Sequence, residues 1–170
     1  MNFSVVVCAK NSEKTIRGCL ESVKSSNTSD IIVIDGNSTD STVQIAREFT
    51  EKVFSDEGRG IAYARQLGAR QAAGEYIAYV DSDVVLSENA LTNMLEDMQR
   101  GGYAGIHAQV MGFETRSYWE WAEDQHFRMR FNKEGARESL GAIAVIYKRD
   151  IILKYGFDSS FDFFGAPEDG

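Results

Sequence analysis

Short apolar runs alternate with amphipathic segments along the first 100 residues of this 170-residue chain, and this alternation limits the possible folds most strongly. Residues 3–9 and 76–80 are continuous apolar runs, which is typical of strands buried on both faces. Shorter strands are expected at residues 31–34 and 53–54. Helical spacing predicts helices at about residues 12–26 (capped by Ser12), 41–50, 60–73 and 88–99. This order predicts an α/β fold with a mixed, mainly parallel sheet flanked by helices.

The second half of the chain has a less regular pattern. We expect strands at residues 103–110 and 142–147, and helices at residues 118–131 and 149–154. With no repeat or linker visible, residues 1–170 are expected to form one domain. Because the chain stops in what the sequence indicates is a loop, we expect a longer parent protein.

The composition of the chain argues against several classes of protein. The chain has 18 Lys and Arg against 26 Asp and Glu, a net charge of −8, which argues against general affinity for nucleic acid. The N-terminus does not form a signal peptide pattern, and no apolar stretch approaches the roughly 20 residues that span a bilayer. Cys8 and Cys19 are expected to be buried free thiols, so we expect a cytoplasmic protein.

Two carboxylates follow the apolar run at residues 76–80, in the segment Asp81-Ser82-Asp83. Ligands usually bind where the strands of an α/β sheet end, and carboxylates two apart in an extended segment point to the same side. Mg²⁺ typically takes one or two protein carboxylates together with substrate phosphates. The segment therefore predicts a metal-bridged phosphate ligand, although the same residues also suit a solvated turn.

Asp35 ends the second expected strand, at the same edge of the sheet. Its carboxylate could accept a hydrogen bond from a nucleobase or a ribose hydroxyl, whereas residues 37–40 after it also suit a helix cap. Gly58-Arg59-Gly60 lacks the spacing of a dinucleotide-binding loop. This segment is either a flexible entry to the next helix or a loop beside the phosphates of a ligand. In the second case, Arg59 or Arg65 would supply positive charge.

Aromatic and basic side chains are interleaved in residues 118–137. One interpretation is a packing helix whose arginines extend to solvent. The other is a contact with an acceptor or a peripheral contact with a membrane surface, because this mixture suits lipid headgroups or a lipid-linked phosphate. The residues concerned are Tyr118, Trp119, Trp121, Phe127 and Phe131, with Arg128, Arg130, Lys133 and Arg137.

Glu168 and Asp169 form an acidic pair in a loop after the aromatic residues 161–164. Adjacent acids often raise one another's pKa, which suits a general base. A polar loop without a catalytic role is equally compatible with the spacing.

Together these motifs resemble family 2 of the inverting glycosyltransferases, which have the GT-A fold, over essentially the whole chain. Residues 5–13 (Val-Val-Val-Cys-Ala-Lys-Asn-Ser-Glu) resemble the family's first strand and its Asn-x-Glu loop. Residues 34–42 resemble its Asp-Gly-Ser-Thr-Asp-x-Thr segment. Residues 60–65 and 73–77, Asp81-Ser82-Asp83, Gly156-Phe157-Asp158 and Glu168-Asp169 follow in the family's order. The usual proline before the first loop is replaced around Cys8-Ala9.

The resemblance implies a nucleotide-binding half at residues 1–100 and an incomplete acceptor half at residues 101–170. The donor would be a nucleotide diphosphate sugar, with UDP expected before GDP, and the acceptor a glycan or a lipid-linked group at the cytoplasmic face of a membrane. Asp169, with Glu168 beside it, would be the general base. Asp81 and Asp83 would ligate Mn²⁺ or Mg²⁺. The implied nucleotide-binding residues are Ala9, Lys10, Asn11, Glu13, Asp35, Arg65, Asp81 and Ser82.

Two other function classes share parts of the pattern. Phosphatases that form an aspartyl phosphate also use a strand followed by Asp-x-Asp, but they place it on the first strand, whereas here it follows the fourth. A non-catalytic nucleotide-sugar-binding domain would share the whole donor site. Phosphate release from simple phosphomonoesters would indicate the first class, and donor binding without transfer or hydrolysis the second.

Overall fold

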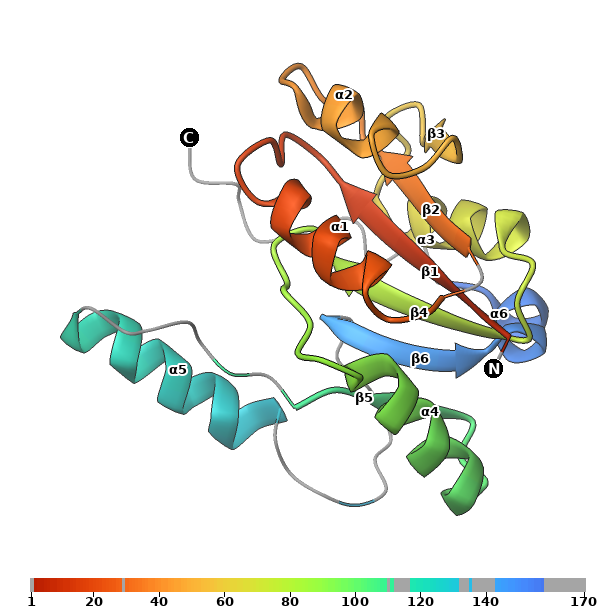
Figure 1. Cartoon of the computed structure of the whole chain (residues 1–170), viewed down its shortest axis with the longest axis vertical. Helices are drawn as coiled ribbons and strands as arrows, with labels where there is room; N and C mark the ends of the chain where they lie inside the picture. The colour runs from red at the N-terminus through yellow and green to blue at the C-terminus, as the bar shows by residue number, and fades with distance from the viewer. Residues whose placement is uncertain are drawn as a thin grey trace.

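The computed structural model describes residues 2–28, 30–109, 111, 117–131, 135 and 143–157. Among these residues, six strands form one sheet in the order β3-β2-β1-β4-β6-β5 (Figure 1). β3, β2, β1 and β4 are parallel neighbours, whereas β6 is antiparallel to β4 and β5 is antiparallel to β6. The predicted mixed, mainly parallel sheet is confirmed. The strands are β1 (Phe3–Ala9), β2 (Asp30–Asp35), β3 (Val53–Ser55), β4 (Tyr76–Asp81), β5 (Gly105–His107) and β6 (Ala144–Lys148).

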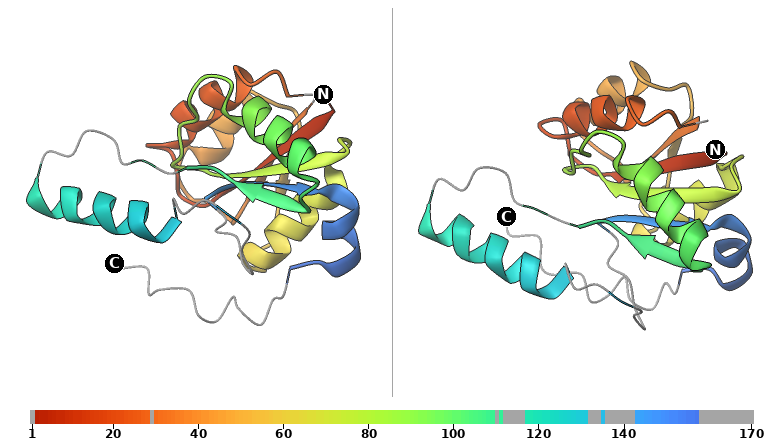
Figure 2. Two further views of the ribbon diagram at one scale, coloured as in Figure 1. Left: turned by 90° about the horizontal axis from the view of Figure 1, so that it is seen from below. Right: turned by 60° about the horizontal axis from the view of Figure 1, so that its bottom comes forward.

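Helices cover both faces of this sheet (Figures 1 and 2). Adjacent residues of β1 pack into different cores, because Val5 and Val7 face one layer of helices and Val6 faces the other. This explains why β1 is a continuous apolar run. The first layer holds α1 (Ile16–Lys24), α2 (Thr42–Arg47) and α4 (Ala90–Gly101), and the second holds α3 (Ile61–Gln71) and α6 (Arg149–Tyr155).

α3 packs closely on β1 because it carries a glycine where the two elements meet. Gly68 is buried, and a Cβ atom at this position would overlap the side chain of Val6. Only a glycine therefore permits this separation between helix and strand. The packing matters for the site because α3 also carries Arg65.

α5 (Tyr118–Phe131) begins and ends where the sequence predicts, but it lies apart from the sheet (Figures 1 and 2). Trp119 is 77% exposed and Met129 is 66% exposed, so most of the surface of each of these two residues is open to solvent. Asp124 is buried and accepts a 2.6 Å hydrogen bond from Arg128 Nε. None of the described helices has both the length and the apolar character required to cross a membrane.

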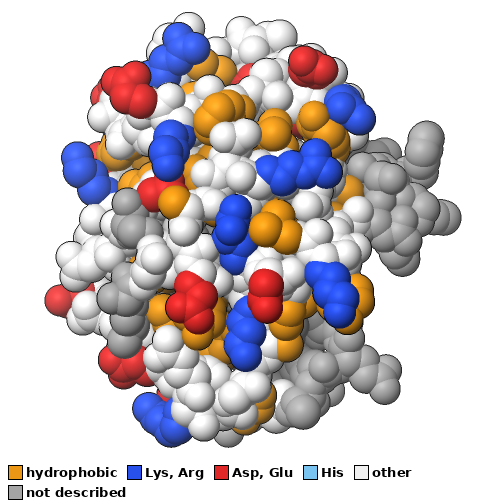
Figure 3. Space-filling view, turned by 90° about the vertical axis from the view of Figure 1, so that its right-hand side faces the viewer, with side chains coloured by type: hydrophobic (Ala, Val, Ile, Leu, Met, Phe, Trp, Pro, Cys, Tyr) orange, Lys and Arg blue, Asp and Glu red, His pale blue; other side chains and the backbone are white. Residues whose placement is uncertain are grey.

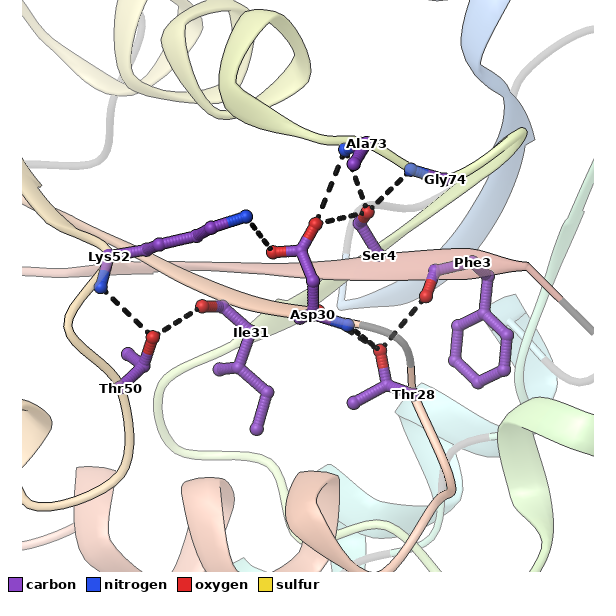
Figure 4. Close-up of polar contacts among 9 residues, drawn as sticks. All are labelled: Phe3, Ser4, Thr28, Asp30, Ile31, Thr50, Lys52, Ala73 and Gly74. Atoms are coloured by element: carbon purple, nitrogen blue, oxygen red, sulfur yellow. Dashed lines mark hydrogen bonds and ion pairs between the residues drawn. The ribbon is translucent and has the colours of Figure 1, made fainter.

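A polar cluster closes the amino-terminal edge of the sheet (Figure 4). Asp30, at the start of β2, accepts hydrogen bonds from Ser4 Oγ (2.7 Å), Lys52 Nζ (2.9 Å) and the backbone N–H of Ala73 (3.2 Å). Ser4 Oγ in turn accepts the backbone N–H of Gly74 at 2.9 Å. Burial opposes ionisation of Asp30, but the hydrogen bonds from Lys52, Ser4 and Ala73 outweigh it and lower the pKa. The cluster ties β1 and β2 to the segments that lead into β3 and β4.

Charges of both signs are interspersed over the face shown in Figure 3. In the described part of that face, Lys and Arg side chains are interspersed with Asp and Glu side chains and do not form one continuous positively charged patch. Opposite charges are therefore neighbours there, although the whole chain has a net charge of −8.

One predicted helix cap is wrong. Ser12 does not cap α1, because the N-cap position is Thr15. The carbonyl oxygen of Ser12 accepts the backbone N–H groups of Thr15 (3.0 Å) and Ile16 (2.9 Å), so Ser12 closes a turn before the helix. Its hydroxyl is engaged with the carbonyl oxygen of Lys10 at 3.1 Å instead of with α1.

Candidate active site

The carboxyl ends of three neighbouring parallel strands bring predicted site residues to one edge of the sheet. Ala9 of β1 lies in register with Asp35 of β2, and Cys8 lies in register with Asp81 of β4. Register partners on neighbouring strands point to the same face of a sheet, so Cys8 and Asp81 share a face. Ala9, Asp35 and Asp81 therefore meet at this edge, although they are far apart in the chain.

The loops that follow β1 and β2 are locked together by hydrogen bonds. The backbone N–H of Asn11 donates to Ser38 Oγ at 2.9 Å, and Asn11 Oδ1 accepts the backbone N–H of Thr39 at 2.9 Å. Glu13 Oε2 accepts the backbone N–H of Ser41 at 3.1 Å. Asn11 has a positive φ of 49°, which Asn adopts more readily than most residues. The side chains of Asn11 and Glu13 therefore hold the shape of this edge.

Asp35 is a buried carboxylate at the end of β2, with 7% of its surface exposed. Its two carboxylate oxygens share the backbone N–H of Ser38, at 3.2 and 3.3 Å, and its carbonyl oxygen accepts the backbone N–H of Asp56 at 2.9 Å. A carboxylate has about four acceptor positions, so further donors can bind it. Lys10 is exposed and lies against Gly36, next to Asp35.

A cavity of about 470 Å³ opens at the same edge. Its volume falls within the range of about 300–1,000 Å³ that is usual for small-molecule sites. A 2.9 Å hydrogen bond between the hydroxyl groups of Ser12 and Ser82 joins the loop after β1 to the turn after β4. The cavity is lined by Cys8, Asn11, Ser12, Lys14, Thr15, Asp81, Ser82 and Asp83.

The segment from Asp81 to Asp83 is a turn, not the extended segment that the sequence argument assumed. The strand ends at Asp81, and the backbone N–H of Val84 donates to the carbonyl oxygen of Asp81 at 3.0 Å, which closes a β-turn. The prediction that strand alternation aligns the two carboxylates is therefore wrong. The turn nonetheless brings Asp81, Ser82 and Asp83 to the wall of one cavity.

The electrostatics of Asp81 are unusual for an aspartate. Burial raises the pKa of Asp81 to about 6; the Arg65 guanidinium partly offsets this effect, and the nearby carboxylate of Asp83 adds to it. Arg65 Nη2 lies 3.6 Å from Asp81 Oδ1. One arginine thus compensates the ionised carboxylate only in part, and a bound cation would favour its ionised form.

The two candidate arginines have different surroundings. The guanidinium of Arg59 stacks over the ring of Tyr63 at 3.7 Å from the ring centroid. Arg65 is mostly buried, with 19% of its side chain exposed, and faces Asp81. Arg65 is therefore the arginine that the fold brings to the acidic residues.

The turn from Asp81 to Asp83 carries two carboxylates and one hydroxyl, which are oxygen ligands. Hard cations such as Mg²⁺ and Mn²⁺ prefer oxygen ligands, and the raised pKa of Asp81 indicates a need for positive charge. Within the described ranges, no group of three or more His, Cys, Asp or Glu side chains could hold a metal ion. The two carboxylates and the hydroxyl of this turn could supply only part of a cation's ligands, and a bound phosphate would supply others.

Sequence reasoning missed four residues that line the cavity: Cys8, Ser12, Lys14 and Thr15. Pairing β1 with β4 would have placed Cys8 beside Asp81, and a later start of the first helix would have left Lys14 and Thr15 in the loop. Burial raises the pKa of the Cys8 thiol to about 12, so this thiol is neutral near pH 7. The predicted catalytic pair, Glu168 and Asp169, lies outside the described residues.

Most of the chain matches one known protein family. The model described as "Glycosyl transferase family 2" matches residues 4–155. The 4,4'-diaponeurosporenoate glycosyltransferase of Staphylococcus haemolyticus is 29% identical over 174 residues, which cover 91% of this chain and 46% of that protein.

Solved structures show the same fold. TarS 1-349 of S. aureus in complex with UDP has a TM-score of 0.74 and 23% identity, covering 95% of this chain and 52% of that chain. The mannosyltransferase PcManGT from Pyrobaculum calidifontis, in complex with GDP-Man and Mn²⁺, has a TM-score of 0.71 and 19% identity, covering 93% and 48%. These likenesses confirm the predicted GT-A fold. The chain spans about half the length of these relatives.

Proposed function

The chain belongs to glycosyl transferase family 2, and from this premise we propose that it transfers a sugar from a nucleotide diphosphate sugar to an acceptor. One observation carries the proposal: the ends of β1 and β4 line a cavity of about 470 Å³ whose wall includes both Asp81 and Asp83, and β2 brings Asp35 to the same edge of the sheet. A site built this way can hold a nucleoside on one side and a diphosphate on the other.

The nucleoside half of the proposed site consists of Asp35, Arg65 and the loop after β1. The buried carboxylate of Asp35 accepts an N–H or O–H of the base or ribose, and Arg65 supplies a donor next to Asp81. The other nucleotide-binding residues are Ala9, Lys10, Asn11, Glu13, Asp81 and Ser82. A structural neighbour in complex with UDP and another with GDP-Man make both nucleotides reasonable, and UDP remains our first expectation.

The diphosphate half consists of Asp81 and Asp83, which would hold Mn²⁺ or Mg²⁺ together with the donor phosphates. A cation bound there supplies charge compensation for the diphosphate leaving group. Asp81 fits this role because burial holds its pKa near 6, so that it is mostly ionised near pH 7 and still lacks full compensation.

The transfer step is proposed to invert the anomeric carbon. An acceptor hydroxyl attacks this carbon from the side opposite the diphosphate, the carbon–oxygen bond to the diphosphate breaks, and Asp169 takes the hydroxyl proton. Glu168 lies next to Asp169 in the chain and would influence its pKa. Alignment of the acceptor with the leaving group supplies the orientation effect.

The acceptor is proposed to be a glycan or a lipid-linked group. The relatives include proteins named teichoic acid poly(glycerol phosphate) polymerase and cholesterol galactosyltransferase, so polymeric and lipid acceptors both occur among them. The exposed Trp119 and Met129 of α5 suit a peripheral contact with a lipid surface at the cytoplasmic face.

Donor binding is the direct test of the proposal. We expect one nucleotide sugar to raise the melting temperature in the presence of Mn²⁺, because a ligand of the native state stabilises it by RT ln(1 + [L]/Kd). Asp83→Asn should abolish most of the metal-dependent part of this rise. Asp97→Asn, on the exposed surface of α4, is the matched control and should behave like the wild type.

Two results would contradict parts of the proposal. If no nucleotide sugar stabilises the protein, the donor site is wrong. If Asp83→Asn binds the donor with unchanged dependence on Mn²⁺, the metal assignment is wrong. A donor that binds without transfer or hydrolysis would indicate the alternative, a nucleotide-sugar-binding domain.

A further inference from the structure

Tyr79 of β4 connects the strand that carries Asp81 to the helix that carries Arg65. The Tyr79 side chain is buried, with 2% of the residue exposed, and its hydroxyl donates a 3.0 Å hydrogen bond to the carbonyl oxygen of Arg65. The guanidinium of the same arginine lies 3.6 Å from Asp81. Tyr79 and Asp81 are two residues apart on one strand, so they share a face. One residue of α3 is therefore held at its backbone and at its side chain by two neighbouring positions of β4.

The ring of Tyr79 is held in place by two other aromatic rings. Tyr147 of β6 packs against it edge-on at 6.4 Å between ring centroids, and Phe157 does so at 5.3 Å. These contacts fix the direction of the hydroxyl group. A phenol hydroxyl is protonated near pH 7, so it can act as the donor of this hydrogen bond.

The carbonyl oxygen of Arg65 lies within α3. In the middle of a helix, each carbonyl oxygen already accepts the N–H four residues later, so this hydrogen bond is not required to satisfy a polar group of α3. The tyrosine hydroxyl, in contrast, would be buried without an acceptor if α3 moved or rotated. The bond therefore favours one placement of Arg65 relative to β4.

The hydrogen bonds of the turn before α3 restrain the start of the helix and do not reach Arg65. The backbone N–H of Gly58 donates to Asp56 Oδ1 at 2.7 Å, and that of Arg59 donates to the carbonyl oxygen of Asp56 at 3.1 Å. An arginine side chain also has several rotatable bonds, so its guanidinium is well placed only if its backbone is fixed. Tyr79 supplies a restraint at that backbone.

We propose that Tyr79 is a positioning residue, whose hydroxyl fixes the backbone of Arg65 and thereby holds the guanidinium beside Asp81 for the donor nucleotide. The consequence for the donor rests on the proposed function, because that function assigns Arg65 to the nucleotide site. The restraint of the Arg65 backbone by Tyr79 does not depend on the proposed function.

The donor-dependent test compares Tyr79→Phe with the wild type. A neutral hydrogen bond contributes about 0.5–1.5 kcal/mol, so we expect the donor KM to rise about two- to tenfold while kcat changes little. Tyr147→Phe is the matched control: it removes a hydroxyl from the same aromatic cluster, one that forms no hydrogen bond with α3 among the described contacts, and its KM should stay at the wild-type value. In an Arg65→Gln background, Tyr79→Phe should have no further effect on KM.

A second measurement needs no donor. NMR of the Arg65 Nε–Hε group in the free protein should show a lower order parameter in Tyr79→Phe than in the wild type, and no change in Tyr147→Phe. Unchanged Arg65 order in Tyr79→Phe, or an equal rise in KM in both variants, would overturn the proposal. If the wild type binds no nucleotide sugar, the proposed function fails, and the Arg65 measurement still decides whether Tyr79 positions this arginine.

Discussion

At the scale of single residues, Asp81 shows how the site opposes the stability of the fold. Burial raises its pKa from an ordinary value of 3.8 to about 6. The ionised carboxylate is therefore less favourable in the folded protein than in the unfolded chain. The folded state therefore favours the protonated acid. The stability associated with this protonated form is fully present below pH 3.8 and is lost as the pH rises through about 6.

Asp81→Asn is accordingly expected to raise the melting temperature at pH 8 and to leave it nearly unchanged at pH 4, because Asn resembles the protonated acid. Each kcal/mol corresponds to about 2–4 °C for a chain of this size. The variant should also lose donor-dependent stabilisation. Thermal unfolding at both pH values measures the effect, with Asp97→Asn as control. A lower melting temperature at pH 8 would show that the Arg65 contact outweighs burial.

At the scale of elements, α3 and β1 depend on one glycine. A Cβ at Gly68 would overlap Val6, whereas a Cβ at Gly18 of α1 would make only an ordinary contact, 3.6 Å from Val85. Both glycines lie within helices, so intrinsic helix propensity favours Ala at both positions. The difference between the two sites therefore isolates the effect of packing.

We expect Gly68→Ala to destabilise the protein by about 1–3 kcal/mol, because overpacking a core forces the helix away from the strand. Gly18→Ala should be neutral or should stabilise by up to about 1 kcal/mol. Urea unfolding of both variants gives the comparison. Equal effects in the two variants would mean that α3 can move without cost. Because α3 carries Arg65, Gly68→Ala should also weaken donor binding.

At the scale of the whole molecule, the two edges of the sheet have different roles. The carboxyl edge carries the incompletely compensated Asp81, while the amino edge is closed by the hydrogen-bonded cluster around Asp30 and Ser4 (Figure 4). The strands separate the two regions. Stability and donor binding should therefore respond independently to changes at opposite edges.

Ser4→Ala tests this separation. It removes the acceptor of the Gly74 N–H and a donor to Asp30, and an unsatisfied buried group costs about 1–3 kcal/mol. We expect a lower free energy of unfolding in urea and an unchanged donor KM. Ser25→Ala, which removes an exposed hydroxyl bonded to the carbonyl oxygen of Ser22, is the control. A changed KM in Ser4→Ala would show that the two edges are coupled.

Local patterns in the chain were sufficient to predict most elements, including β1 and α5 with their observed bounds. This succeeded because the spacing of apolar residues reports which faces are buried, and burial is a property of the neighbouring sequence. The prediction that Ser12 caps the first helix was wrong. The Ser12 hydroxyl contacts Ser82, which is far away in the chain, and its carbonyl oxygen closes a turn before the helix. Sequence spacing alone contains no information about that partner.

The family motifs and the mainly parallel sheet followed from the sequence, and with them the meeting of Asp35 and Asp81 at one edge, because parallel strands joined by helices place their carboxyl ends together. Three features required the tertiary structure: the turn at Asp81-Ser82-Asp83, the choice of Arg65 over Arg59, and the hydrogen bond from Tyr79 to α3. Each depends on the distance and rotation between elements. Those quantities are set by packing at positions such as Gly68 and Val6, which lie far apart in the chain.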